Sequence, residues 1–435
     1  MIAIVGGGIA GLAAAHRLQQ RGESVTVYES SDQVGGLAAT YETAGDRIEQ
    51  YYHHLSKTEE TIVELIEDLG LGEDLRWPIG GDAYYMDGVV YPLDTIWEIA
   101  AYPHMSLYDK FRLGMLVLGV DLRGGVPTFG TYDELKAFDD VPIKEFVLEH
   151  TTRGVYENFF EPLLEAKFGS RKDDVSAAWL LGRVRFRGER DLLRGEPLGY
   201  LDGGFGRLLD ALVEDVGMEN VELNARVTDV AIADGAVEGV TVEQDGETRE
   251  EDAEAMVVAA MPNVLEALTG YECDIDFQGT VCSVVSLEES LTDTYWLNIG
   301  DDAPFGALIE HTNYIDESHY GGEHLLYVPK YVQSESDPVW QKDDEEVEAH
   351  WLAGIEDLFP GFDRESVNWI ETARNPRTAP VYERGYLEEI VPYDLADEVV
   401  AGVYYAGMGS RAQYPERSLN GGIVAGYEVA DRIAE

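Results

Sequence analysis

Three features are scarce in this 435-residue chain: cysteine, positive charge and long apolar runs. Its two cysteines, Cys273 and Cys282, exclude a disulfide framework and lack metal-site spacing, so we expect free thiols in a reducing compartment. The longest apolar run, residues 113–120, is too short for a membrane-spanning helix, which needs about 20 residues. With 31 basic residues against 84 acidic ones, electrostatic binding of nucleic acid is disfavoured.

The acidic excess gives a net charge of −53 and is spread along the whole sequence. Only 8 of the bases are lysine. This pattern is typical of adaptation to molar salt, where a Debye length of about 3 Å removes the self-repulsion of the folded state. We therefore expect a haloarchaeal, cytoplasmic protein that loses stability at low salt. We also expect no signal peptide, because the first predicted strand begins at Ile2.

The most informative motif lies at the start of the chain. Residues 2–5 are an apolar run typical of a buried parallel strand, and Gly6, Gly8 and Gly11 follow as G-x-G-x-x-G. A helix is predicted next, then a second strand that ends at Glu29. Such glycines permit a tight turn and close approach of backbone N–H groups to a pyrophosphate, while the acid binds an adenosine ribose. The unit predicts a Rossmann-type dinucleotide site; a glycine turn without a ligand is the alternative.

A pair of glycines soon after this acid indicates backbone that passes close to the cofactor. Gly35 and Gly36 precede Leu37 at this point. With the first motif, they resemble the FAD-dependent amine oxidase superfamily, which includes protoporphyrinogen oxidases, phytoene-type desaturases and flavin monoamine oxidases. The resemblance implies FAD as the cofactor. Gln33 and Leu37 stand where many members carry basic residues, which argues against an amine-oxidase subtype.

Later segments resemble the remaining cofactor-binding parts of this family. Residues 399–405 predict a strand, 406–409 a turn, and 418–426 the start of a closing helix whose free N–H groups suit an electron-rich ring edge. Met408 stands where most members have an acid, and a plain strand–helix unit is the alternative. The FAD-binding residues that the resemblance implies are Gly6, Gly8, Ile9, Ala10, Gly11, Glu29, Ser30, Gly35, Gly36, Leu37, Val227, Ala260, Gly407, Met408, Asn420, Gly421 and Gly422.

Two adjacent histidines are the catalytic candidates. His53 and His54 follow the glycine pair by about one strand. Relatives that include UDP-galactopyranose mutase place a histidine beside the flavin ring near this point, and we favour His53 slightly. An imidazole there would hydrogen-bond a flavin carbonyl or move a proton near neutral pH. A histidine that satisfies buried backbone is the alternative.

Five arginines within residues 183–194 form an exceptional cluster in so acidic a chain. If residues 183–187 are extended, Arg183, Arg185 and Arg187 share one face. Guanidinium groups bind carboxylate or phosphate through paired hydrogen bonds, so the cluster predicts an anionic substrate such as a porphyrinogen carboxylate or a diphosphate. A surface ion-pair network is the alternative.

Further substrate candidates are weaker. Arg374 and Arg377 precede Tyr382, which we expect near the site. Lys167 lies in a segment that resembles a family segment near the substrate cavity, with a position on a helix surface as the alternative. No pattern of metal ligands is present in the sequence.

The predicted fold class is α/β with two discontinuous domains. Residues 1–80, 196–265 and 386–435 are assigned to an FAD-binding domain with a parallel, glutathione-reductase-like sheet. Residues 81–195 and 266–385 are assigned to a substrate domain with a mixed sheet and a helical cap. The second domain is expected to begin with a hairpin whose turn is Asp87-Gly88. Residues 96–122 are expected to form helices that pack on the core, or that touch a membrane as in relatives with lipid-soluble substrates.

The sequence thus predicts an FAD-dependent oxidoreductase that takes hydride from an organic substrate, anionic or isoprenoid, and passes the electrons to an unidentified acceptor. Protoporphyrinogen-oxidase-like and desaturase-like chemistry both fit the resemblance. A mutase-like isomerase of nucleotide sugars and a non-catalytic FAD-binding protein are the alternatives.

Overall fold

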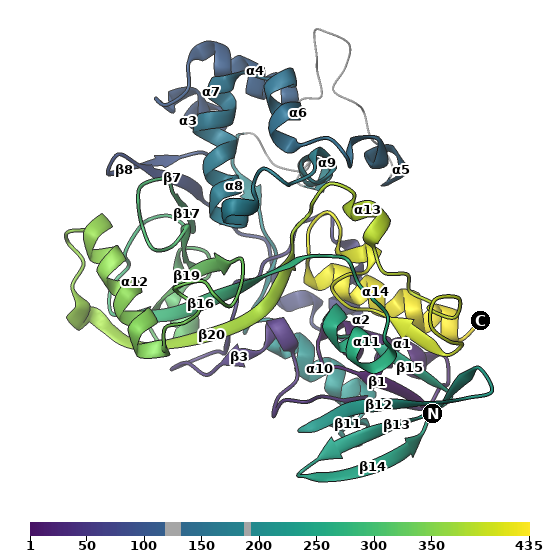
Figure 1. Ribbon diagram of the computed structural model, residues 1–435. Coiled ribbons are helices and arrows are strands. Elements are labelled where there is room, and N and C mark those ends of the chain that lie inside the picture. The colour runs from purple at the N-terminus through teal and green to yellow at the C-terminus, as the bar shows by residue number, and fades with distance from the viewer. Residues whose placement is uncertain (118–131, 187–192) are drawn as a thin grey trace.

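The computed structural model describes residues 1–117, 132–186 and 193–435, and it confirms the predicted α/β fold (Figure 1). One sheet has the strand order β11-β2-β1-β15-β21 and is parallel throughout. Both β1 and β15 are buried along their whole length, as expected for parallel strands covered on both faces. The strands are β1 (Ile2–Val5), β2 (Val25–Tyr28), β11 (Val221–Glu222), β15 (Ala255–Val258) and β21 (Val403–Tyr405).

Two helices from opposite ends of the chain pack together beside this sheet. These are α1 (Ile9–Gln20) and α14 (Leu419–Ile433), and any side chain at Gly426 would collide with the backbone of Ala10. The close approach places the N-termini of both helices near the ends of the strands. An antiparallel meander packs against the sheet through apolar residues that include Val227 and Val240. Its strands are β12 (Ala225–Ala233), β13 (Ala236–Gln244) and β14 (Glu247–Asp252).

The second large sheet is mixed, as predicted. Its order is β20-β16-β19-β18-β17-β7-β8, and only the β17–β7 pair is parallel. Helix α12 (Asp344–Leu358) covers one face through buried residues such as Trp351. The strands are β7 (Asp82–Met86), β8 (Val89–Pro92), β16 (Phe277–Leu287), β17 (Trp296–Ile299), β18 (Ala307–Glu310), β19 (His324–Val332) and β20 (Val367–Pro380).

A group of helices forms a cap over this sheet, at the top of Figure 1. The cap is held by an aromatic and aliphatic core that includes Phe146, Phe168 and Trp179. Its main helices are α3 (Ile96–Ala101), α4 (Leu107–Val117), α6 (Ile143–His150), α8 (Glu161–Phe168) and α9 (Ala177–Phe186). Both sheets draw on the chain segments predicted for the two domains; the domain boundaries themselves stay a prediction.

Local predictions fare differently in this second region. The hairpin is confirmed: Asp87 and Gly88 both have positive φ, as a tight two-residue turn requires. The extended conformation considered for residues 183–187 is wrong, because residues up to 186 continue helix α9. A helix does not have the two-residue alternation of a strand, on which the expectation of a shared arginine face depended. Arg187 and residues 118–122 lie outside the described residues.

The first two cap helices expose an unusual number of large apolar side chains. Trp97 is 70% exposed, Leu107 82% and Phe111 55%, while Leu113 and Leu116 on the same helix α4 point into the core. The predicted helices thus combine core packing with an exposed apolar face. Within the described residues, none of the helices has both the length and the apolar content needed to span a bilayer.

Candidate functional site

A continuous cavity of about 1,220 Å³ extends from the parallel sheet to the mixed sheet and the cap. At one end its wall is formed by residues that follow the parallel strands: Gly6 after β1, Glu29 after β2 and Ala406 after β21. These positions are the carboxyl ends of the strands, where open α/β sheets bind ligands. At the other end the wall includes Lys167 from α8 and Trp296 from β17. The cavity thus connects the predicted cofactor region with the mixed sheet and the cap.

The glycine turn forms an open cradle for a pyrophosphate. Gly6 has a φ of +108°, and a Cβ there would lie 2.7 Å from the carbonyl oxygen of Ala259. Gly8 is the N-cap of α1 and makes no side-chain cap, so the first N–H groups of this helix are free to bind an anion. Among the described residues other than its chain neighbours, a Cβ on Gly8 would meet no atom nearer than 3.9 Å, which leaves this backbone open to a ligand.

Glu29 is held in place beside this turn by its neighbours. Its Oε2 accepts a hydrogen bond from the Gly7 backbone N–H at 2.7 Å, and its Oε1 accepts from the backbone and hydroxyl of Ser31, each at 2.8 Å. These bonds fix the carboxylate on the cavity wall. Its position suits the hydroxyl groups of a ribose.

Most residues that the sequence implied for FAD line the cavity. The exceptions are Gly11, which packs against Gly6, and Asn420 and Gly421. Asn420 Oδ1 instead accepts a hydrogen bond from the Ile62 N–H at 2.9 Å. The open cradle, the uncapped helix and the fixed carboxylate fit FAD. The residues along the wall are Gly6, Gly8, Ile9, Ala10, Glu29, Ser30, Gly35, Gly36, Leu37, Val227, Ala260, Gly407, Met408 and Gly422.

His53 lies on the cavity wall as a neutral imidazole. Burial lowers its pKa to about 4, and its Nδ1 lies 2.6 Å from the carbonyl oxygen of Tyr51. Because a carbonyl only accepts, we assign the proton to Nδ1, which leaves a lone pair on Nε2. His54 also lines the cavity, but its Nδ1 contacts the Tyr295 hydroxyl at 3.0 Å and its ring packs edge-on against Trp296.

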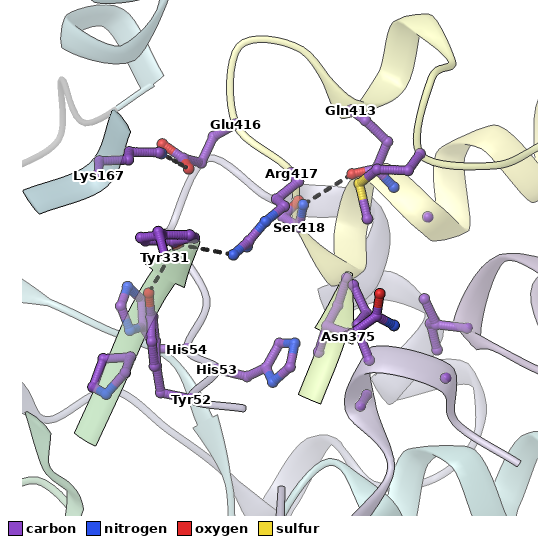
Figure 2. Close-up of a pocket in the computed structure, with 18 of the residues that line it drawn as sticks. Tyr52, His53, His54, Lys167, Tyr331, Asn375, Gln413, Glu416, Arg417 and Ser418 are labelled. Carbon is purple, nitrogen blue, oxygen red and sulfur yellow. Dashed lines mark hydrogen bonds and ion pairs between the residues drawn. The ribbon is translucent and has the colours of Figure 1, made fainter. Parts of the chain in front are cut away.

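Lys167 and Arg183 meet in the cavity although they lie on different helices. Glu416 bridges them: its Oε1 accepts from Lys167 Nζ at 2.8 Å (Figure 2), and its other oxygen pairs with Arg183. Burial lowers the pKa of Lys167 to about 7, with Arg183 acting in the same direction and Glu416 opposing it. Trp179 packs against both cations, and its ring centroid lies 5.1 Å from the Lys167 nitrogen.

Sequence reasoning missed Arg417, which points into the middle of the cavity (Figure 2). Its Nη2 donates to the Tyr331 hydroxyl at 3.0 Å, and this hydroxyl lies 3.1 Å from that of Tyr52. Asn375 from β20 and Gln413 complete the polar wall in the same view. Arg417 directly precedes Ser418, the N-cap of α14. This position beside a helix predicted to bind the cofactor is the sequence feature that could have identified Arg417 as a site residue.

The other substrate candidates lie elsewhere. Arg374 is outside the cavity wall, where it pairs with Asp344 and donates to the carbonyls of Trp340 and Lys342. Arg377 is exposed on the surface. Tyr382 is buried behind the wall, stacked on Trp179. Arg185 belongs to α9, but its side chain is outside the described part of the chain.

Glu59 provides a prediction about pH. It lines the cavity at 2% exposure, and burial raises its pKa from 4.5 to about 7, against hydrogen bonds from Ser418 and Ser56. A raised carboxyl pKa stabilises the fold below pH 4.5, and this stabilisation disappears as the pH rises through 7. Between pH 5 and 8, the Glu59 carboxyl should therefore lower the free energy of unfolding by on the order of 3 kcal/mol or less. Glu59→Gln removes this contribution, so its melting temperature should fall less over the same pH range.

The matched control is Glu64→Gln, at an exposed carboxylate of the adjacent helix α2 (Glu60–Asp68). Its pH profile should follow that of the unchanged protein. Equal profiles for the two variants would contradict a buried, protonated Glu59.

Comparisons with known proteins agree with this geometry. The family described as flavin containing amine oxidoreductase matches residues 9–434. The chain spans about half the length of the curated relatives it matches. Coproporphyrinogen III oxidase from Propionibacterium freudenreichii, for example, is 26% identical over 280 residues, which are 51% of this chain and 50% of that protein.

Two solved structures show the same fold at low identity. A protein from Exiguobacterium, provisionally assigned as a protoporphyrinogen oxidase, has a TM-score of 0.78 at 18% identity and covers 100% of this chain and 98% of its own. Reduced UDP-galactopyranose mutase has a TM-score of 0.74 at 16% identity, over 99% and 95% of the two chains. The match over residues 9–434 shows that the chain belongs to the flavin-containing amine oxidoreductase family, and this membership implies FAD as its cofactor.

Proposed function

We propose that this protein is an FAD-dependent oxidoreductase that removes a hydride equivalent from a small organic substrate. The observation that carries this proposal is the continuity of the cavity, which joins the glycine cradle to polar and aromatic side chains of the mixed sheet and cap. When bound, the flavin accepts the hydride and passes the electrons to oxygen or another acceptor. The task of the protein is to hold and orient the substrate and to exclude water.

The residues around the far half of the cavity are suited to orientation rather than to proton transfer by histidine. A pKa of about 4 makes His53 a weak base near neutral pH, and its Nε2 lone pair is suited to accept a hydrogen bond from an N–H group. Asn375 and Tyr331 face the same space from strands β20 and β19. We therefore assign His53 a positioning role.

The test is anaerobic reduction. Purified holoenzyme is mixed without oxygen with candidate substrates, and the flavin absorbance near 450 nm is followed, a wavelength at which oxidised flavin absorbs and reduced flavin largely does not. Bleaching by a substrate supports the proposal. A reaction that needs pre-reduced flavin and shows no net redox change identifies a mutase-like isomerase instead. A flavin that no substrate class alters identifies a non-catalytic FAD-binding protein.

An isoprenoid substrate is the second candidate, and one observation favours it. Three apolar residues of α4 line the cavity: Leu113, Leu116 and Val117. Trp97 of α3 and Phe111 of α4 are exposed on the outer surface of the cap. A lipid-soluble substrate would enter from a membrane through such an apolar edge. In that case polyisoprenoids bleach the flavin and carboxylate-bearing compounds do not.

A further inference from the structure

Positive charge is concentrated at one place in the cavity of this otherwise acidic chain. Lys167, Arg183 and Arg417 come from α8, α9 and the segment before α14, and all three line the wall. Glu416 is the one carboxylate in contact with them among the described residues. Two arginines, and a lysine whose pKa burial lowers to about 7, contact a single acid and leave an excess of positive charge inside a protein whose net charge is −53.

Glu416 pairs with two of these groups and not with the third. Lys167 and Arg183 each contact one of its oxygens, with side chains that are 16% and 27% exposed. Arg417 has no carboxylate within ion-pair distance among the residues that the structure describes, and its buried Nε also lacks a hydrogen-bond partner there. The hydrogen bond that its side chain makes with another side chain in the described residues is to the Tyr331 hydroxyl.

An unpaired guanidinium in this position is energetically costly. Arginine stays protonated in proteins, and a charge that is partly removed from water without a counter-charge destabilises the fold. The nearby Tyr52 hydroxyl does not supply that charge, because burial raises its pKa well above 10 and keeps it neutral. An anion with oxygen acceptors would supply the counter-charge that Arg417 lacks.

We propose that the substrate carries a carboxylate, and that this group binds Arg417 beside Lys167 and Arg183. This inference rests on the proposed function and names its substrate class. A carboxylate matches the fork of N–H groups on a guanidinium, and its charge is opposite in sign to the excess charge of the cluster. The walls around the cluster include Trp179, Leu163 and Phe159, so the rest of the substrate is apolar or aromatic.

The experiment measures ligand binding rather than turnover. Oxidised holoenzyme is titrated by calorimetry with 3-phenylpropionate and with its neutral amide, at one fixed KCl concentration. The carboxylate should bind more tightly than the amide. Arg417→Gln should weaken carboxylate binding by about 10- to 100-fold and leave amide binding unchanged, because it removes a charge-assisted hydrogen bond. Arg417→Lys, which keeps the charge and loses the fork, should give an intermediate loss.

Glu416→Gln provides a test of opposite sign. Removing the competing carboxylate leaves Lys167 and Arg183 available, so carboxylate binding should become tighter while amide binding does not change. This variant keeps the test decisive if Arg417→Gln does not fold. The matched control is Arg374→Gln, at an arginine paired with Asp344 outside the cavity, which should bind the carboxylate like the unchanged protein.

Equal binding of acid and amide would overturn the carboxylate assignment, as would equal losses in Arg417→Gln and Arg374→Gln. Weaker carboxylate binding by Glu416→Gln would also overturn it. Each of these results leaves the proposed function intact if the protein still contains FAD and a substrate bleaches it. Failure of the proposed function is a different result: a flavin that no substrate alters.

Discussion

Gly8→Val is expected to give a folded protein that no longer binds FAD. Gly8 has a φ of −74° and a ψ of 177°, a conformation that valine adopts readily, and the nearest described atom beyond its chain neighbours would lie 3.9 Å from an added Cβ. The valine side chain would project into the cradle where the pyrophosphate approaches the start of α1. The purified variant should therefore be colourless, with about a 100-fold or greater loss of FAD affinity, because a pyrophosphate that cannot reach the N–H groups forfeits several hydrogen bonds.

Substitutions at two other glycines serve as controls that distinguish loss of FAD binding from loss of the fold. Gly114→Ala changes a helical glycine of α4 at which an added Cβ would meet no described atom outside its own helix within 4 Å, so this variant should keep both its fold and its FAD. Gly11→Ala places a methyl group against the carbonyl of Gly6, and this clash should lower the melting temperature of the protein itself. A Gly8→Val protein that retains one FAD per chain would contradict the assignment of the cradle.

The cofactor end of the molecule was predictable because its signals are local. The strand, turn, helix and acid between Ile2 and Glu29 lie within one short segment, and each residue type has a direct conformational reason to be there. The hairpin at Asp87 and Gly88 was predictable for the same reason. In both cases the residues that contact one another are close in the sequence, so the spacing of residue types is enough to predict the local structure.

The substrate end depends on contacts between distant residues. Lys167 and Arg183 reach Glu416 across 249 and 233 positions, and no periodicity in the sequence encodes such a meeting. The arginine cluster was noticed by its composition, but the assumption of an extended segment was wrong because residues 177–186 form a helix in the cap core. Arg417 was missed because its neighbours had been considered for the flavin, whereas its own side chain turns toward Tyr331.

Lowering the salt concentration is expected to lower the melting temperature of the protein strongly. At a net charge of −53, dilute buffer leaves the carboxylates repelling one another over a Debye length of about 10 Å, whereas molar salt shortens this length to about 3 Å. The melting temperature should therefore fall by about 10 °C or more between molar and 0.1 M KCl, because self-repulsion destabilises the compact state. NaCl at equal ionic strength should act like KCl. An unchanged melting temperature would contradict the prediction.

The edge strand β14 allows this effect to be tested locally. Glu250 is exposed and has no ion pair among the described residues, whereas the adjacent Glu251 pairs with Arg249 at 2.8 Å. If repulsion between carboxylates causes the loss, Glu250→Gln should reduce the difference in melting temperature between high and low salt by a small amount, since a single exposed charge contributes less than about 1 kcal/mol. Glu251→Gln should not reduce it, because that substitution removes an attraction along with a charge. Identical behaviour of the two variants would indicate that salt acts on this protein by a route other than screening of its carboxylates.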